Sequence, residues 1–258
     1  MKYFFILIFI TTSCASIKWP SFNSDIEEEN VLVDYEEFDN KDYLDHLRSF
    51  EKIYISTLKN DITEVKAESY KYLSTIIRKI ELNNELFFKT KTMPKFYIVN
   101  DMTPFHFSLP GKKFFLSAGL IKKYIKNEVM LYCLLSFELV RSEKDIYHKE
   151  MIIPVGVLTT QQMISLTRIS ANDKVEVHKW AFYILKRVGI EPESYLAWLQ
   201  VINRNSMDFA LQLGDIHSIS KEESMFKAFL IANEKRDQIN RHHGSSREFY
   251  KFIKKIKG

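Results

Sequence analysis

Apolar side chains recur at a spacing of about 3.6 residues along much of this chain, a period that predicts helices. The pattern begins near Lys41 and continues to Leu82 with charged residues between the apolar positions, so we expect one long helix there. Gly189 and Pro192 mark the end of a later helix, because glycine favours a left-handed cap and proline cannot continue a helix. Further helical stretches are expected at residues 173–188, 192–203 and 222–257.

Three short extended segments interrupt the helical pattern in the middle of the chain. They are rich in aromatic and β-branched residues, which favour strands. Pro110-Gly111 separates the last two segments, and this dipeptide is typical of a turn. The expected strands are Lys95–Val99, Phe105–Leu109 and Lys113–Ser117.

The stretch from Glu128 to Val140 is apolar on nearly every side of the helix that it predicts. A helix of this kind lies in a protein core rather than on a surface. Lysines before it, and Arg141 and Lys144 after it, exclude a membrane span, which needs roughly 20 apolar residues. Together these elements predict an α+β fold that is rich in helix and has a small β-sheet.

The N-terminus has the order of a secretory signal peptide. Met1-Lys2-Tyr3 is a short basic start, residues 4–10 (FFILIFI) are apolar, and small residues precede Cys14. This order resembles the bacterial lipobox, in which the cysteine carries fatty acyl chains such as palmitate and becomes the mature N-terminus. Thr11 stands where lipoboxes usually have leucine, so an ordinary signal peptide with an incidental cysteine is the alternative.

Residues 1–13 are therefore interpreted as a lipoprotein signal peptide and residues 14–40 as an acidic tether. Seven acidic residues between Asp25 and Glu37 have no compensating base, and such a run stays solvated. The folded domain is expected over residues 41–258. Ala15, rather than aspartate, follows the cysteine, and in the sorting signals that this resembles it indicates the outer membrane, facing the periplasm.

Composition excludes some classes of function. The net charge of +4 gives no case for nucleic-acid binding. If Cys14 carries lipid, Cys133 is the one thiol left in the mature chain, which excludes an internal disulfide. Because Cys133 lies in the apolar stretch, we expect a buried and inert thiol.

Four segments in a fixed order resemble the membrane-associated gluzincin peptidases, the family of HtpX and the CAAX-prenyl proteases. These segments are Thr103–Leu120 (TPFHFSLPGKKFFLSAGL), Asn127–Arg141 (NEVMLYCLLSFELVR), Lys174–Pro192 and Gly214–Glu223. In that family a segment close to NAFALPGGxIFVxxGLL precedes an apolar helix that ends in HExxH. The residues in register are Leu109-Pro110-Gly111, Phe115, Gly119-Leu120, Glu128 and Glu138. The resemblance implies a zincin-like version of the α+β fold.

The same register defines the candidate site. In a gluzincin, two histidines one helical turn apart hold zinc, and the glutamate between them activates the metal-bound water. Here the two histidine positions are Phe137 and Arg141, and counting back from Gly189 places the third ligand position at Lys174. Glu138 alone remains, as a vestigial general-base position. The resemblance therefore predicts neither a metal nor another cofactor for this chain.

Two of the replacements are cations near the remaining carboxylate. Arg141 lies three residues after Glu138 on the same helix face, within reach of a salt bridge. Lys174 would approach from the second helix. A carboxylate in an apolar helix is costly to bury unless it is paired. We therefore expect the cations to take over the volume and the charge of zinc, and Glu138 to be a structural ion-pair member.

The function that follows is that of a catalytically inactive, metallopeptidase-like lipoprotein. The lipid on Cys14 would hold it at the bacterial envelope, where it would bind or scaffold polypeptides such as outer-membrane proteins or another envelope enzyme. Three alternatives remain: an active envelope metalloendopeptidase with a nonstandard metal site, an envelope scaffold without a cleft function, and an accidental resemblance. Candidate ligands for a rebuilt metal site are His148, Glu176 and His178, although the last two do not share a helix face.

Overall fold

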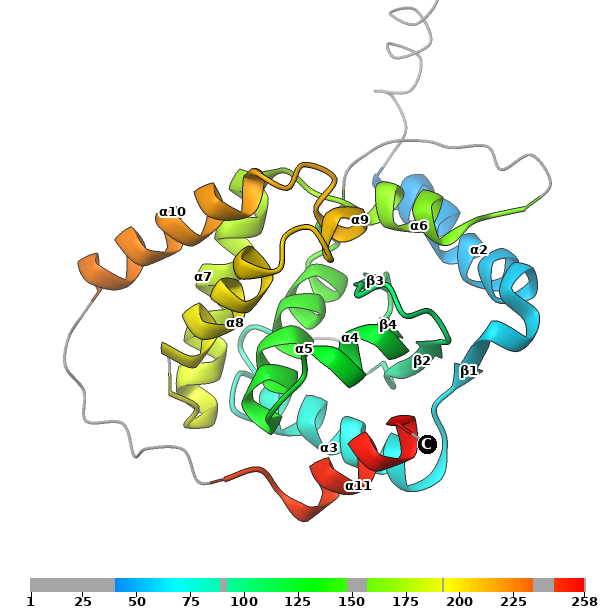
Figure 1. Ribbon diagram of the computed structural model, residues 1–258, viewed down its shortest axis with the longest axis horizontal. Helices are drawn as coiled ribbons and strands as arrows, with labels where there is room; N and C mark the ends of the chain where they lie inside the picture. Colours follow the sequence, from blue (N-terminus) through cyan, green and yellow to red (C-terminus); the bar gives the residue numbers. More distant parts are fainter. Residues whose placement is uncertain (1–39, 89–91, 148–156, 192, 234–243, 258) are drawn as a thin grey trace, which may run out of the picture. The chain divides into compact units, whose positions relative to one another are not determined.

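The computed structural model describes residues 40–88, 92–147, 157–191, 193–233 and 244–257. Residues Lys41–Gly258 form one compact unit, an α+β fold rich in helix, as the sequence predicts (Figure 1). The predicted lipidation site Cys14 and the acidic tether lie outside the described residues, as does His148. Within the described ranges, no helix is both long enough and apolar enough to cross a membrane.

The helices of this unit differ widely in length. They are α2 (Asn40–Leu58), α3 (Ala67–Leu82), α4 (Ala118–Lys123), α5 (Glu128–Glu143), α6 (Thr160–Thr167), α7 (Ala171–Val188), α8 (Glu193–Arg204), α9 (Ala210–Leu213), α10 (Ser218–Ala232) and α11 (Arg247–Lys257). The strands are β1 (Ile62–Glu64), β2 (Lys95–Val99), β3 (His106–Leu109) and β4 (Lys113–Ser117).

The four strands form one mixed sheet in the order β1-β2-β4-β3. β2 and β4 run parallel, whereas β1 with β2 and β3 with β4 are antiparallel pairs. The three predicted strands are confirmed, and so is the turn between β3 and β4. Gly111 has a φ of 83° in that turn, a conformation that glycine adopts without steric cost.

The prediction of one long N-terminal helix is wrong. The helical pattern is split into α2 and α3, and β1 lies between them. Lys59 before β1 and Ala67, the first residue of α3, have positive φ angles of 48° and 52°, which the interior of a right-handed α-helix does not accommodate. Pairing of Ile62 with Val99 gives β1 a partner at the sheet edge, so strand pairing overrides the helical period. Likewise, the helical stretch expected at 222–257 contains two helices, α10 and α11.

The sheet separates two apolar clusters, and alternate residues of β4 belong to each. Phe114 and Leu116 pack in the cluster that contains α3 and α5, whereas Phe115 packs with Tyr54 of α2. This alternation follows from the two-residue period of a strand. The rings of Tyr54 and Phe115 lie 5.7 Å apart, centroid to centroid.

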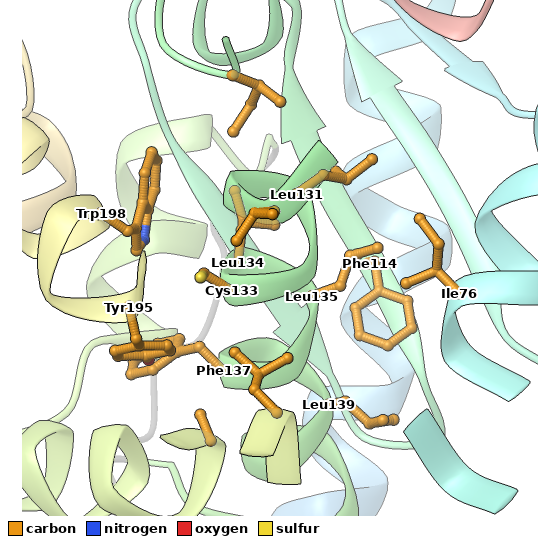
Figure 2. Close-up of a cluster of buried hydrophobic side chains, with 14 of the residues drawn as sticks. Ile76, Phe114, Leu131, Cys133, Leu134, Leu135, Phe137, Leu139, Tyr195 and Trp198 are labelled. Carbon is orange, nitrogen blue, oxygen red and sulfur yellow. The ribbon is translucent and has the colours of Figure 1, made fainter. Parts of the chain in front are cut away.

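The helix α5 is the centre of the larger cluster, as its uniformly apolar sequence predicts. Figure 2 shows Phe114 and Ile76 on one side of α5 and Tyr195 and Trp198 on the other. Cys133 is fully buried there, and burial raises the pKa of its thiol. The predicted burial of Cys133 is therefore confirmed. The raised pKa keeps the thiol protonated, and a protonated thiol is a poor nucleophile.

Shortening a side chain of α5 tests this packing. Leu134 is fully buried, so Leu134→Ala is expected to lower the free energy of unfolding by about 2–5 kcal/mol, measured by urea denaturation. Leu86 is 88% exposed, and Leu86→Ala is expected to change the same quantity by less than about 0.5 kcal/mol. Equal effects of the two substitutions would contradict the central place of α5.

Candidate functional site

Glu138 is fully buried on the side of α5 that faces strand β3. Its Oε1 lies 2.6 Å from Nδ1 of His106, and its Oε2 accepts a 2.7 Å hydrogen bond from the Ser108 hydroxyl. Nη1 of Arg141 lies 3.2 Å from both carboxylate oxygens. The predicted pairing of Glu138 with Arg141 is thus confirmed, and two residues of β3 complete the shell around the carboxylate.

This shell fixes the charge of Glu138. Burial alone would raise the pKa of the carboxyl, but Arg141, His106 and Ser108 together lower it to about 2. Glu138 is therefore ionised at neutral pH and binds protons weakly. A general base works best when its pKa lies near the operating pH, so this carboxylate is suited to holding charge in place rather than to moving protons.

The guanidinium of Arg141 is itself enclosed. Its Nη2 donates to the carbonyl of Thr167, the last residue of α6. Its central carbon lies 5.6 Å from the ring centre of Phe137 and 5.7 Å from that of Tyr147. Only 2% of Arg141 is exposed, and its Nε has no hydrogen-bond partner within the described ranges. The cation is held by a carboxylate, a carbonyl and two aromatic rings.

A second buried ion cluster lies on α7, α8 and α10. Lys174 donates to Glu222 over 3.0 Å, and Nε2 of His178 lies 3.5 Å from the other oxygen of Glu222. Nδ1 of His178 lies 2.8 Å from the Tyr195 hydroxyl. Burial lowers the pKa of His178 although Glu222 opposes this. Burial would raise the pKa of Glu222, but His178 and Lys174 outweigh it and lower that pKa.

The two clusters meet at one small cavity of about 40 Å³. Since a water molecule needs roughly 10–15 Å³ of such space, the cavity has room for about three or four waters and none for a polypeptide. The lining includes the three positions that the resemblance assigns to zinc ligands, together with three neighbours: Phe137, Arg141, Lys174, His106, His178 and Glu222. Lys174 of α7, more than thirty residues from α5 in sequence, thus lines the same cavity as Phe137 and Arg141, which are one turn apart on α5.

Lys174 departs from its expected role. We predicted that it would approach Glu138, but its ammonium pairs with Glu222 of α10 instead. Sequence reasoning missed Glu222, which lies in an ordinary acidic pair with Glu223. It also missed His106 and Ser108. The sequence could have indicated His106 and Ser108. Residues two apart on a strand share a face, and two polar groups on a face that packs against a core helix are unusual.

The alternative metal site is not assembled. Glu176 has a side chain that is 61% exposed and pairs with Lys179, whereas His178 is buried and faces Glu222. The two side chains point apart, as their spacing on the helix predicts. Within the ranges that the structure describes, no three His, Cys, Asp or Glu residues are placed to hold a metal ion.

The edge strand beside the cavity is covered. All four residues of β3 are buried, and α6 packs against the strand. The backbone N–H of His106 donates to Oε1 of Gln212 over 2.9 Å, so a side chain occupies a position where an added strand would pair. A polypeptide could pair with β3 only after Gln212 and α6 had moved away.

Neither a scan against models of protein families nor a search of curated proteins finds a match for this chain.

The buried carboxylate predicts how stability depends on acid. The folded-state pKa of Glu138 is about 2 and its ordinary value is 4.5, so its contribution is complete above pH 4.5 and is lost between about pH 4.5 and 2. That contribution is about 3 kcal/mol, at about 1.4 kcal/mol per pKa unit. Urea denaturation at a series of pH values measures it.

The matched variant is Glu138→Gln. It leaves Arg141 buried without its carboxylate, so we expect the free energy of unfolding at pH 7 to fall by about 3–5 kcal/mol. We also expect a flatter acid limb than in the parent. An unchanged acid limb would show that other carboxylates cause the acid sensitivity.

Proposed function

We propose that this chain is a catalytically inactive relative of the membrane-associated gluzincin peptidases. A lipid on Cys14 would anchor it in the bacterial envelope, and it would bind or scaffold polypeptide partners there. Two independent lines support the relationship. The sequence motifs occur in the family's order, and Phe137, Arg141 and Lys174, assigned from that order alone, line one cavity.

The observation that carries the proposal is the contact between Arg141 and Glu138. In an active gluzincin the glutamate works on a water bound to zinc, and the position of Arg141 belongs to a zinc-binding histidine. Here a permanent cation occupies that position, and the carboxylate binds the cation. The residues at the two positions that serve peptide hydrolysis in an active gluzincin form an ion pair with each other here.

The residues present do not fit a zinc ion. Phenylalanine has no donor atom, and arginine does not lose its proton in proteins. The ammonium group of Lys174 forms an ion pair with Glu222. Where the family segment NAFALPGG has its two alanines, this chain has His106 and Ser108, and both bind Glu138. Loss of the ligands is thus accompanied by new polar groups that stabilise the carboxylate without a metal.

Binding of a partner follows from surface features, because the cavity is too small to admit a chain. Outer-membrane proteins or another envelope enzyme are the partners that an envelope location suggests. The short edge strand β1 has exposed side chains at Thr63 and Glu64, whereas β3 is covered. Strand addition at β1 is therefore the mode of polypeptide binding that requires the least rearrangement.

The test of the proposal measures metal and cleavage together. We expect the purified mature chain to contain far less than one zinc per molecule by mass spectrometry, and to leave casein uncut with or without a chelator. Glu138→Gln is the control, since it separates this chain from a contaminating protease. Stoichiometric zinc and chelator-sensitive cleavage that Glu138→Gln abolishes would establish the alternative, an active metalloendopeptidase.

Restoring the ligands tests the register. The triple variant Phe137→His, Arg141→His, Lys174→Glu rebuilds HExxH and a third ligand. If the assigned positions are right, this variant acquires about one zinc per chain with three protein ligands, as in catalytic zinc sites. The double variant that keeps Lys174 is the control, and we expect weaker binding. A folded triple variant, checked by circular dichroism, that takes up no zinc would contradict the register.

A further inference from the structure

The folded unit is far more basic than the whole chain. Residues 1–40 contain 2 lysines and 8 acidic residues, so residues 41–258 hold 35 basic and 25 acidic residues. The net charge of this unit is thus +10, compared with +4 for the chain. A charge of this size on a compact unit attracts anionic surfaces over a distance.

Much of the charge gathers on the C-terminal helix α11, which lies beside α3 in Figure 1. Phe249, Phe252 and Ile253 bury one face of this helix, which contacts α3 and α4. Tyr250 is 60% exposed, and Lys251, Lys254 and Lys255 of α11 are exposed with it. The helix therefore presents ammonium groups and an aromatic ring to solvent on a backbone that its buried face holds in place.

Two grooves of about 370 Å³ and 490 Å³ flank α11 and join it to α3 and α4. Ser69 and Lys255 line both grooves, so the two lie side by side. Three carboxylates, Glu64, Glu68 and Glu248, share the grooves with a larger number of lysines. We define the α11 surface as the lysines that line them: Lys66, Lys71, Lys122, Lys251 and Lys255. Within the described ranges these five lysines have no ion-pair partner.

We propose that the α11 surface docks onto the anionic headgroups of a lipid bilayer. The interaction joins lysine ammonium groups to lipid phosphates. It deepens the proposed function and rests on it in one respect, because the lipid on Cys14 would keep a bilayer within reach of the domain. Docking would then orient the folded unit, with α11 toward the bilayer.

The chemistry of the surface favours a bilayer over a folded acidic partner. The cations that line the two grooves are all lysines, with no arginine among the described lining residues. Lysine is a point charge on a flexible stem that can reach many phosphates, whereas arginine's planar fork suits defined two-point contacts. Tyr250, exposed on the same helix, has the amphipathic ring that favours the headgroup level of a membrane. Because α11 buries its apolar face, the attraction is electrostatic and weakens with salt.

The experiment uses the mature chain, residues 14–258, with Cys14→Ser, so that no acyl group contributes. We expect it to sediment with vesicles of equimolar phosphatidylglycerol and phosphatidylcholine and not with vesicles of phosphatidylcholine alone. Binding should fall as salt rises above about 0.1 M, where the Debye length is about 10 Å. Equal binding to both kinds of vesicle would overturn the proposal.

A pair of charge-matched variants locates the interaction. Lys71→Glu, Lys251→Glu, Lys255→Glu should lower the partition coefficient at least about 100-fold, since each lysine near an anionic bilayer contributes about fivefold. The control Lys52→Glu, Arg187→Glu, Lys221→Glu makes the same charge change on α2, α7 and α10 and should keep most of the binding. All six side chains are exposed, so circular dichroism should show both variants folded.

Two further outcomes would overturn the proposal. Equal loss of binding in both variants would mean that only net charge matters. Capture of polyglutamate, abolished by the α11 substitutions, without any vesicle binding would identify an acidic polypeptide as the partner instead. Failure here is distinct from failure of the pseudopeptidase proposal, because this assay reads neither metal nor cleavage.

Discussion

A buried carboxylate at the centre of an apolar helix is the constraint on which the rest of this structure depends. Glu138 is fully enclosed in α5, and an unpaired charge there would cost several kcal/mol. Arg141 supplies the opposite charge from the same helix, and His106 and Ser108 of β3 supply hydrogen bonds. Because Arg141 also binds the Thr167 carbonyl, satisfying one carboxylate ties the core helix to the edge strand and to the end of α6.

The parts of the fold that the sequence predicts are those determined locally. Strands β2 and β4 follow from short aromatic and β-branched runs, and α5 follows from a long apolar run. The contact of Glu138 with Arg141 follows from a spacing of three residues on one helix. By contrast, β1 was missed, because its strand conformation depends on pairing with Val99, more than thirty residues away.

The candidate site shows the same division between local and distant information. The resemblance to the gluzincin motifs assigns Phe137, Arg141 and Lys174 to one site, and the three side chains line one cavity. The ion-pair partner of Lys174 could not be predicted from the sequence motifs. Glu222 reaches it from α10, and only the packing of α10 against α7 makes the pair. Nothing in the local sequence of Glu222 distinguishes it from the solvated carboxylates of other helices.

Under the proposed relationship to the gluzincin peptidases, side chains at the cavity take the place of a metal centre. A zinc ion contributes two positive charges that must be captured from solution, and the fold of a structural zinc site then depends on the supply of metal. Here Arg141 and Lys174 contribute two positive charges that belong to the chain, each beside its own carboxylate, Glu138 or Glu222. The positive charges that balance Glu138 and Glu222 are therefore in place as soon as the chain has folded. In the proposed relationship, such a centre would be independent of metal and would lack the open coordination position that peptide hydrolysis requires.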